Sequence, residues 1–273
     1  MIVNRWISLY AVMTLILLWS SNAIGQDSIY IFRFPSSSEI EINVAASAEA
    51  QQNVYRYQYI VSSSDSSEQS TWVLEVQGSS LVDSVFSPAG WRGDSYGIRS
   101  LVSWGARDSA HQIVPGGNLG GFGFTSTGLP AIQTYYAEGW VPVPVLEREP
   151  DSLENDDILA DMRSGRTLGA RTSPSPFIAL DFLDTLISMA QEALSLGWIE
   201  ETYGEKIMND LNDAREKMEE SPEDAKEILE ALIPYIIDDG CDWVPPDPSQ
   251  YHLTSEGCAL LRYNVEYLIE QIE

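Results

Sequence analysis

Cysteine, histidine and positive charge are all scarce in this sequence of 273 residues. It contains two cysteines, two histidines and 15 lysines and arginines, against 41 aspartates and glutamates, so the formal net charge is -26. A negative field of this size repels phosphate backbones and anionic lipid, so we expect no nucleic-acid partner. No motif in the sequence indicates a cofactor. The high negative charge favours solubility.

Long apolar runs are missing after the first 25 residues. The single basic residue Arg5 precedes an apolar run from Trp6 to Trp19, and small and polar residues follow up to Gly25. This order is typical of a secretory signal peptide, here residues 1–25. The alternative is an uncleaved membrane anchor. It is less favoured, because the apolar run is shorter than the roughly 20 residues that a membrane-spanning helix needs. We therefore expect the mature chain to be secreted, periplasmic or on the cell surface, without a membrane span.

Helical periodicity is missing between residues 28 and 140. Instead, Tyr55, Tyr57 and Tyr59 alternate with polar residues, as in a half-buried strand. Similar short strands are predicted at 30–34, 39–44, 54–61, 72–77, 82–86, 100–104, 120–124 and 131–136. Because no crossover helices separate them, the pattern predicts an antiparallel immunoglobulin-like β-sandwich over residues 26–146.

Lysine is missing from the glycine-rich stretch 113–124, and a strand pattern rather than a helix follows its first glycines. A phosphate-binding loop needs a helix N-terminus and usually a lysine, so a Pro-Gly turn that enters a bulged strand is the favoured interpretation. The run from Pro115 to Phe124 resembles a Pro-Gly-x-x-x-x-Gly-Phe-x-Phe segment in sandwich domains of many exported bacterial proteins.

Aromatic residues in the β half suggest one candidate ligand site. The aromatic residues that could stack against sugars are Trp91, Tyr96, Tyr135, Tyr136 and Trp140, and the candidate site consists of Trp91, Tyr135, Tyr136 and Trp140. Trp91 follows Pro88-Ala89-Gly90, a loop-like context that would leave its ring accessible. The alternative is that these rings fill the sandwich core, as large aromatics commonly do.

One histidine in this half also has a possible chemical role. His111 stands near Asp108, but no particular serine is nominated as a nucleophile beside it.

Strand alternation is lost in residues 147–175, which are rich in acids, serine and proline and predict an acidic linker. From residue 176 onward, apolar residues recur at steps of three and four, which predicts four helices in an antiparallel bundle over residues 176–273. Pro176 suits the first turn of the first helix, and Gly197 suits its C-cap. Ser221 is the expected N-cap of the third helix, and Pro234 should kink that helix or loosen its last turn.

Both cysteines fall near the end of the chain, at Cys241 and Cys258. In an exported protein this pair favours a disulfide, which would fasten the end of the third helix to the start of the fourth. Nearby carboxylates are candidate calcium ligands: Asp238, Asp239, Asp242 and Asp247. The alternative is a solvated acidic loop.

The helical half resembles the FIMAH-type helical modules at the C-termini of many exported bacterial proteins. The residues that carry the likeness are Gly197-Trp198-Ile199, Ile207, Leu211, Ala214, Ala225, Leu229, Leu232, Ile233, Leu253, Ala259, Leu260 and Leu261. The cysteine pair and the stretch 242–248 depart from that pattern. The resemblance implies a non-catalytic module with no catalytic residues to transfer.

Together these patterns predict a two-domain chain, all-β and then all-α, with an acidic linker between the domains. We expect a secreted, non-enzymatic protein with an interaction, surface or matrix role and an unidentified protein or polysaccharide partner. Two alternatives stay open: a carbohydrate-binding module that uses exposed aromatics, and a carboxylate-dependent secreted hydrolase.

Overall fold

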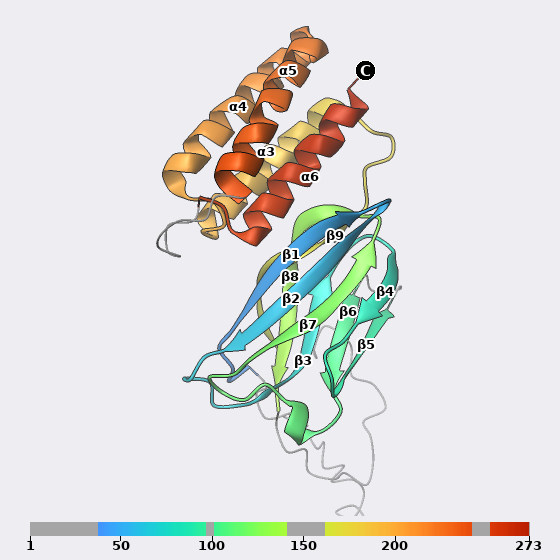
Figure 1. Cartoon of the computed structure of the whole chain (residues 1–273), viewed down its shortest axis with the longest axis vertical. Helices are drawn as coiled ribbons and strands as arrows, with labels where there is room; N and C mark the ends of the chain where they lie inside the picture. Colours follow the sequence, from blue (N-terminus) through green and yellow to red (C-terminus); the bar gives the residue numbers. More distant parts are fainter. Residues whose placement is uncertain (1–37, 97–100, 141–161, 242–251, 273) are drawn as a thin grey trace, which may run out of the picture. The chain divides into compact units, whose positions relative to one another are not determined.

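The computed structural model describes residues 38–96, 101–140, 162–241 and 252–272 (Figure 1). The strands in these ranges are β1 (Ile42–Gln51), β2 (Val54–Ser63), β3 (Thr71–Gln77), β4 (Val82–Phe86), β5 (Trp91–Tyr96), β6 (Leu101–Ala106), β7 (Asn118–Ser126), β8 (Leu129–Gly139) and β9 (Arg163–Arg171). The helices are α3 (Ala179–Ser195), α4 (Glu201–Glu220), α5 (Pro222–Pro234) and α6 (Ser255–Gln271), with a short 3-10 helix η1 (Ser109–His111) and a π-helix η2 (Tyr235–Cys241). The predicted signal peptide and the predicted strand at 30–34 lie outside the described residues.

The strands form two antiparallel sheets, as expected for a β-sandwich. One sheet has the order β1-β2-β7-β4 and the other the order β5-β6-β3-β8-β9. By position these orders correspond to the A-B-E-D and C″-C′-C-F-G sheets of a variable-type immunoglobulin domain. The order of the strands along the chain differs from that of an immunoglobulin. Here β4, at the position of strand D, precedes β5 and β6, whereas strand D of an immunoglobulin follows C′ and C″. The strand positions are therefore immunoglobulin-like, while the connections between β3 and β7 are not.

The predicted alternation in β2 is confirmed. Tyr57, Tyr59 and Val61 are buried between the sheets. Each buried tyrosine hydroxyl donates to a backbone carbonyl, Tyr57 to Gly128 at 2.8 Å and Tyr59 to Leu168 at 2.9 Å. These bonds satisfy the polar ends of rings that would otherwise be costly to bury.

The glycine-rich stretch forms the predicted turn and bulge. Gly121 has a φ of +97°, and the pairing of β7 with β2 shifts at this point. Gly123 lies so close to β2 that an added Cβ would stand 2.4 Å from the Tyr57 carbonyl oxygen. Glycine at these positions therefore lets Phe122 and Phe124 point into the core, where both are buried.

Two strands occur where the sequence does not predict them. Strand β9 lies inside the stretch 147–175 that was predicted as a linker, and it pairs with β8 over its whole length. The linker prediction is therefore wrong for Arg163–Arg171. Strand β5 begins at Trp91, which was expected to stand in a loop.

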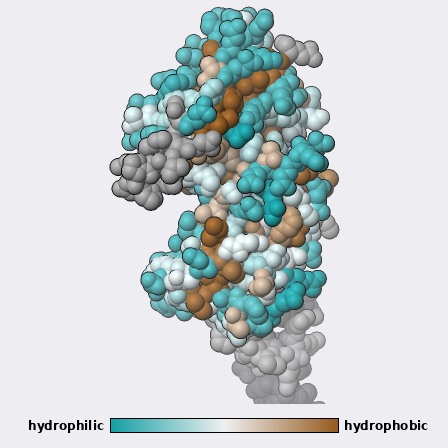
Figure 2. Space-filling view, in the orientation of Figure 1, coloured by the Kyte–Doolittle hydropathy of each residue, from teal (hydrophilic) through white to brown (hydrophobic). Residues whose placement is uncertain are grey.

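In the described ranges, four α-helices follow the sandwich, as predicted. Helix α3 contacts α4, α4 contacts α5, α5 contacts α6, and α6 contacts α3 (Figure 1). Hydrophilic side chains cover much of the helical face in view in Figure 2, with apolar strips between them. No helix in the described ranges is long and apolar enough to cross a membrane.

The ends of the helices follow the capping residues closely. The Ser221 side chain accepts a backbone N–H group at the start of α5, as predicted, and the Thr254 side chain does the same at the start of α6. Helix α3 differs, because it begins at Ala179 and not at Pro176. Phe177 is held before the helix, where its ring packs against Phe182 and Tyr267.

Pro234 has the predicted effect on its helix. Helix α5 ends at Pro234, and the chain continues directly as the π-helix η2. Proline lacks the N–H that would continue the α-helical hydrogen bonds, which explains the change of winding at this residue.

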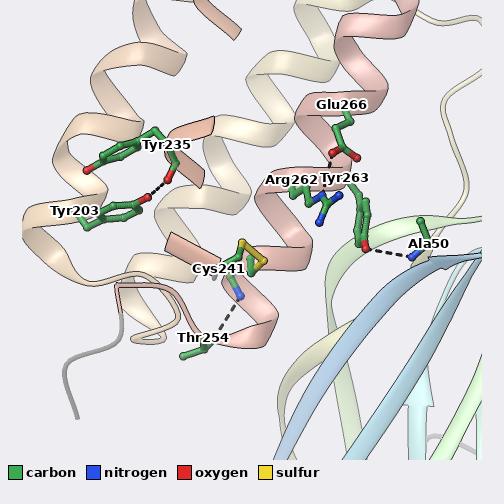
Figure 3. Close-up of a disulfide and its surroundings, with 10 residues drawn as sticks. Ala50, Tyr203, Tyr235, Cys241, Thr254, Arg262, Tyr263 and Glu266 are labelled. Carbon is green, nitrogen blue, oxygen red and sulfur yellow. Dashed lines mark hydrogen bonds and ion pairs between the residues drawn. A yellow bond between two sulfur atoms is a disulfide. The ribbon is translucent and has the colours of Figure 1, made fainter. Parts of the chain in front are cut away.

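The predicted disulfide between Cys241 and Cys258 is present, with a Cα–Cα distance of 5.4 Å (Figure 3). It joins the last residue of η2 to the first turn of α6. The covalent contact expected from the cysteine spacing is therefore confirmed.

Helix α6 packs on the edge strand β1. The Ala46 N–H donates to a carboxylate oxygen of Glu256 at 2.6 Å, and the Ser255 hydroxyl donates to the Ala46 carbonyl at 2.8 Å. Further along, the Ala50 N–H donates to the Tyr263 hydroxyl oxygen at 3.1 Å (Figure 3). Side chains of α6 thus satisfy backbone groups that an edge strand leaves unpaired.

Candidate functional site

The four aromatic residues predicted as a ligand surface do not share one face. Trp91 and Tyr135 are only 2% and 7% exposed. The Trp91 indole N–H donates to the His111 carbonyl, and the Tyr135 hydroxyl donates to the Ile42 carbonyl. Both rings therefore belong to the core, which corrects the expectation of exposed rings.

Tyr136 and Trp140 remain outside the core. Successive residues of a strand point to opposite faces, so Tyr136 lies on the outer face of the five-stranded sheet. Its hydroxyl accepts a hydrogen bond from the Gln77 amide at 3.3 Å. Trp140 is 40% exposed and meets the Trp72 ring edge to face.

The predicted calcium ligands are only partly described. Asp238 is exposed and lies in η2 with Asp239, whereas Asp242 and Asp247 lie outside the described residues. Within the described ranges, no three His, Cys, Asp or Glu side chains gather as a metal site would require. Calcium binding at this loop stays a prediction.

The His111–Asp108 pair forms, with 2.7 Å between His111 Nδ1 and an Asp108 carboxylate oxygen. The hydrogen bond from His111 lowers the pKa of Asp108 below its ordinary value. The His111 ring covers Gly90, where an added Cβ would stand 1.7 Å from it. In this structure the residue therefore packs against Gly90 and, through its carbonyl, holds Trp91.

A trough on the outer face of the five-stranded sheet is the strongest candidate site. Its floor is strand β6, where Ser103 and Gly105 are small and an added Cβ on Gly105 would meet nothing within 4 Å. We call this hollow the β6 trough, a space of about 420 Å³ lined by Arg92, Asp94, Tyr96, Ser103, Gly105, Ala106 and Arg107. Small residues between larger ones on a sheet face produce such a hollow.

The wall of the trough formed by β5 offers several kinds of contact. Tyr96 is 53% exposed, so its ring can meet a ligand. Arg92 and Asp94 are exposed beside it, with 4.0 Å between their charged groups. Arg107 adds a second guanidinium at the end of β6. One aromatic face, two guanidinium groups and a carboxylate therefore converge on one open hollow.

Two carboxylates lie on the same sheet face next to the trough. Cross-strand pairing places Glu75 opposite Ser103 on one side and opposite Tyr136 on the other, while Glu138 lies opposite Val73. Burial, and then the negative charge of Glu75, raise the pKa of Glu138 from its ordinary value of 4.5 to about 7. Near neutral pH this carboxyl group is therefore divided between its protonated and ionised forms.

The sequence contained part of the signal for this site. Tyr96 is an aromatic residue in the β half, but the run WRGDSY of β5 has no apolar alternation that would predict an edge strand. The trough depends on the pairing of β5 with β6, which brings Asp94 opposite Ser103. That pairing is a tertiary feature, and local sequence does not specify it.

Comparisons with known proteins add little to this picture. No protein-family model and no curated protein matches the chain. A solved structure of an uncharacterized protein from Nocardia farcinica, described as having an immunoglobulin-like fold, shares 17% identity with it. The alignment covers 48% of this chain and 98% of that chain, with a TM-score of 0.29. A likeness this weak supports no conclusion, and the resemblance of the helices to FIMAH modules stays a prediction.

Proposed function

We propose that this chain is an exported, non-catalytic binding protein and that the β6 trough holds its ligand. The confirmed disulfide fits an oxidising compartment outside the cytoplasm, as the predicted signal peptide requires. In this proposal the sandwich carries the recognition surface, and the helices form a four-helix bundle appended to it.

The trough favours a carbohydrate over an apolar ligand. An aromatic ring beside a small-residue floor allows a sugar ring to stack, and the neighbouring charged groups can bind hydroxyls at fixed positions. Arg92, Asp94 and Arg107 supply such groups around Tyr96. This grouping of a half-exposed tyrosine with hydrogen-bonding side chains over Ser103 and Gly105 is the observation that carries the proposal.

Glycan binding is tested by titrating the purified protein with a panel of soluble polysaccharides, read by calorimetry and by affinity electrophoresis. We expect at least one glycan to bind, and Tyr96→Ala to weaken binding by about tenfold or more, as expected when a central stacking ring is lost. Trp140→Ala is the matched control, because Trp140 is an exposed aromatic outside the trough. Equal losses in both variants, or no binding across the panel, would contradict the proposal.

A carboxylate-dependent hydrolase is the second candidate, favoured by one observation. Glu138 has a raised pKa beside Glu75, and a protonated acid next to an ionised one is the arrangement that glycoside hydrolysis uses. The same glycan panel distinguishes the two functions when released reducing ends are measured. Turnover that disappears in Glu138→Gln supports the hydrolase, and binding without turnover supports the binding protein.

A further inference from the structure

A groove between helices α3 and α4 has properties unlike those of the trough. It has a volume of about 970 Å³, and the residues that line it include Leu194, Ile199, Glu200, Glu201, Glu205 and Met208. These residues come from the last turns of α3, the connection after it and the first turns of α4. The groove therefore lies where the chain reverses direction.

The floor of this groove is apolar. Ile199 is buried, and Leu194 and Met208 are half-buried beside it. Gly204 allows the close packing, because an added Cβ there would stand 2.3 Å from a Leu194 methyl carbon. The groove can therefore take apolar side chains from a partner into a preformed hollow.

The rim of the groove is acidic, and the one basic side chain paired with it in the described residues is His252, whose Nδ1 lies 3.9 Å from the Glu200 carboxylate. Among the described residues that line the groove, three are glutamates and none is Lys, Arg or His. Glu200 is held in place as the N-cap of α4, where its carboxylate accepts the N–H groups of Thr202 and Tyr203. Glu201 and Glu205 are exposed. The rim thus presents fixed negative charge above an apolar floor.

The surrounding chain strengthens this charge. From residue 176 to the end there are 23 acids and 5 bases, a net charge of -18. One of the few bases near the groove, Lys206, is already paired with Asp210 at 2.5 Å. A partner with positive charge would therefore be drawn to this region at low and moderate salt.

We propose that this groove docks a cationic amphipathic segment of another protein, with apolar side chains on the floor and lysines or arginines against the rim. The recognition is of the helix-in-groove kind, in which the apolar face of the segment gives affinity and its charges give orientation. Charge complementarity selects this occupant, because an anionic peptide of the same apolar pattern is repelled by all three rim glutamates.

The probe is a fluorescein-labelled synthetic amphipathic peptide of leucine and lysine, titrated with the full-length exported protein and read by anisotropy. Two peptides serve as controls: one with glutamate in place of lysine, and one with serine in place of leucine. We expect the leucine–lysine peptide alone to bind, with an affinity that falls as salt is raised. Equal binding of the serine–lysine peptide would show attraction by charge without a groove and would overturn the proposal.

Two double variants separate the groove from the general acidity of the helices. In E201K/E205K we expect binding to weaken by about tenfold or more, because both changes lie on the rim. In E227K/E230K, which makes the same charge change at exposed positions of α5 outside the groove, we expect a loss of less than about threefold. Similar losses in both, or no binding at low salt, would refute the docking site.

A third variant tests the floor directly. Met208→Asp increases the negative charge but removes an apolar contact, so we expect weaker binding, whereas a purely electrostatic attraction would be unchanged or stronger. Circular dichroism checks that the variant is folded. If it is not, the comparison of leucine and serine peptides decides the same question with the unaltered protein.

Discussion

The carboxyl group of Glu138 links the pH of the medium to the stability of the sandwich. Its pKa rises from 4.5 to about 7 because of burial and the neighbouring charge of Glu75. The folded chain therefore favours the protonated form, so this contribution to stability is fully present below pH 4.5 and is lost as pH rises through about 7.

Glu138→Gln tests this linkage, because it keeps the shape and removes the titration. Relative to the unaltered protein, we expect the variant to gain about 1–2 kcal/mol at pH 8, allowing for the solvent that screens a half-buried group, and to gain little at pH 4.5. Urea unfolding at several pH values measures the difference. A constant difference across this range would show that Glu138 does not titrate near neutral pH.

The burial of single aromatic residues could not be predicted from the sequence. The buried positions of Trp91 and Tyr135 depend on partners far along the chain, the His111 carbonyl and the Ile42 carbonyl. Gly165 is another case, since an added Cβ would stand 2.5 Å from the Tyr135 ring. The residues next to an aromatic side chain in the sequence do not show whether it lies on the surface or is buried against a distant part of the chain.

Whole elements were predicted with unequal success. The helices followed from the apolar spacing of residues such as Ile207, Leu211 and Ala214, all buried, and the start of α5 followed from its serine cap. The start of α3 did not, because no side chain caps that helix. Strand β9 was missed because Leu168 is its only large apolar buried residue. Its other buried residues are small or polar, among them Thr167, which donates to the Val44 carbonyl. The apolar spacing and caps that predict a helix lie within one segment of sequence. The formation of β9 depends instead on its pairing with β8, which its own sequence does not show.

The disulfide between η2 and α6 should stabilise the elements that it joins. It connects residues 17 apart, and closing a loop of this length contributes about 3 kcal/mol in the chain-entropy account. We expect the double variant Cys241→Ser/Cys258→Ser to lose about this much, measured by urea unfolding followed by circular dichroism. The unaltered protein under reducing conditions is the matched comparison, and no loss in either would show that the disulfide contributes nothing.

At the scale of the whole molecule, the contacts of α6 with β1 and β8 couple the sandwich to the helices. Glu256 is buried and accepts the Ala46 N–H, and the buried Asn264 amide donates to the Pro130 carbonyl at 2.8 Å. The sequence, read as two domains and a linker, did not predict this junction. The Ala46 N–H and the Pro130 carbonyl receive these side-chain partners only when both parts are folded against each other.

Glu256→Ala tests the coupling. The change leaves the Ala46 N–H without its acceptor, so we expect a loss of about 1–3 kcal/mol, and Glu256→Gln should lose less because it keeps an acceptor oxygen. Unfolding is followed by far-ultraviolet circular dichroism for the helices. Tryptophan fluorescence follows the sandwich in a Trp198→Phe/Trp243→Phe background, which removes the tryptophans after residue 176. If the parts are coupled, both signals shift together, and a shift confined to the helices would show that they unfold independently.

The π-helix η2 has a consequence for how much insertion or deletion this region tolerates. Each residue of an α-helix turns the chain by about 100° around the helix axis. A π-helix has more residues per turn, so the winding after Pro234 sets the direction in which the Cys241 side chain points toward Cys258. Removing one residue from η2 would rotate Cys241 away from its partner even if every other contact were kept. The number of residues in η2 is therefore fixed by the direction in which Cys241 must point. We expect substitutions within η2 to be tolerated more readily than insertions or deletions.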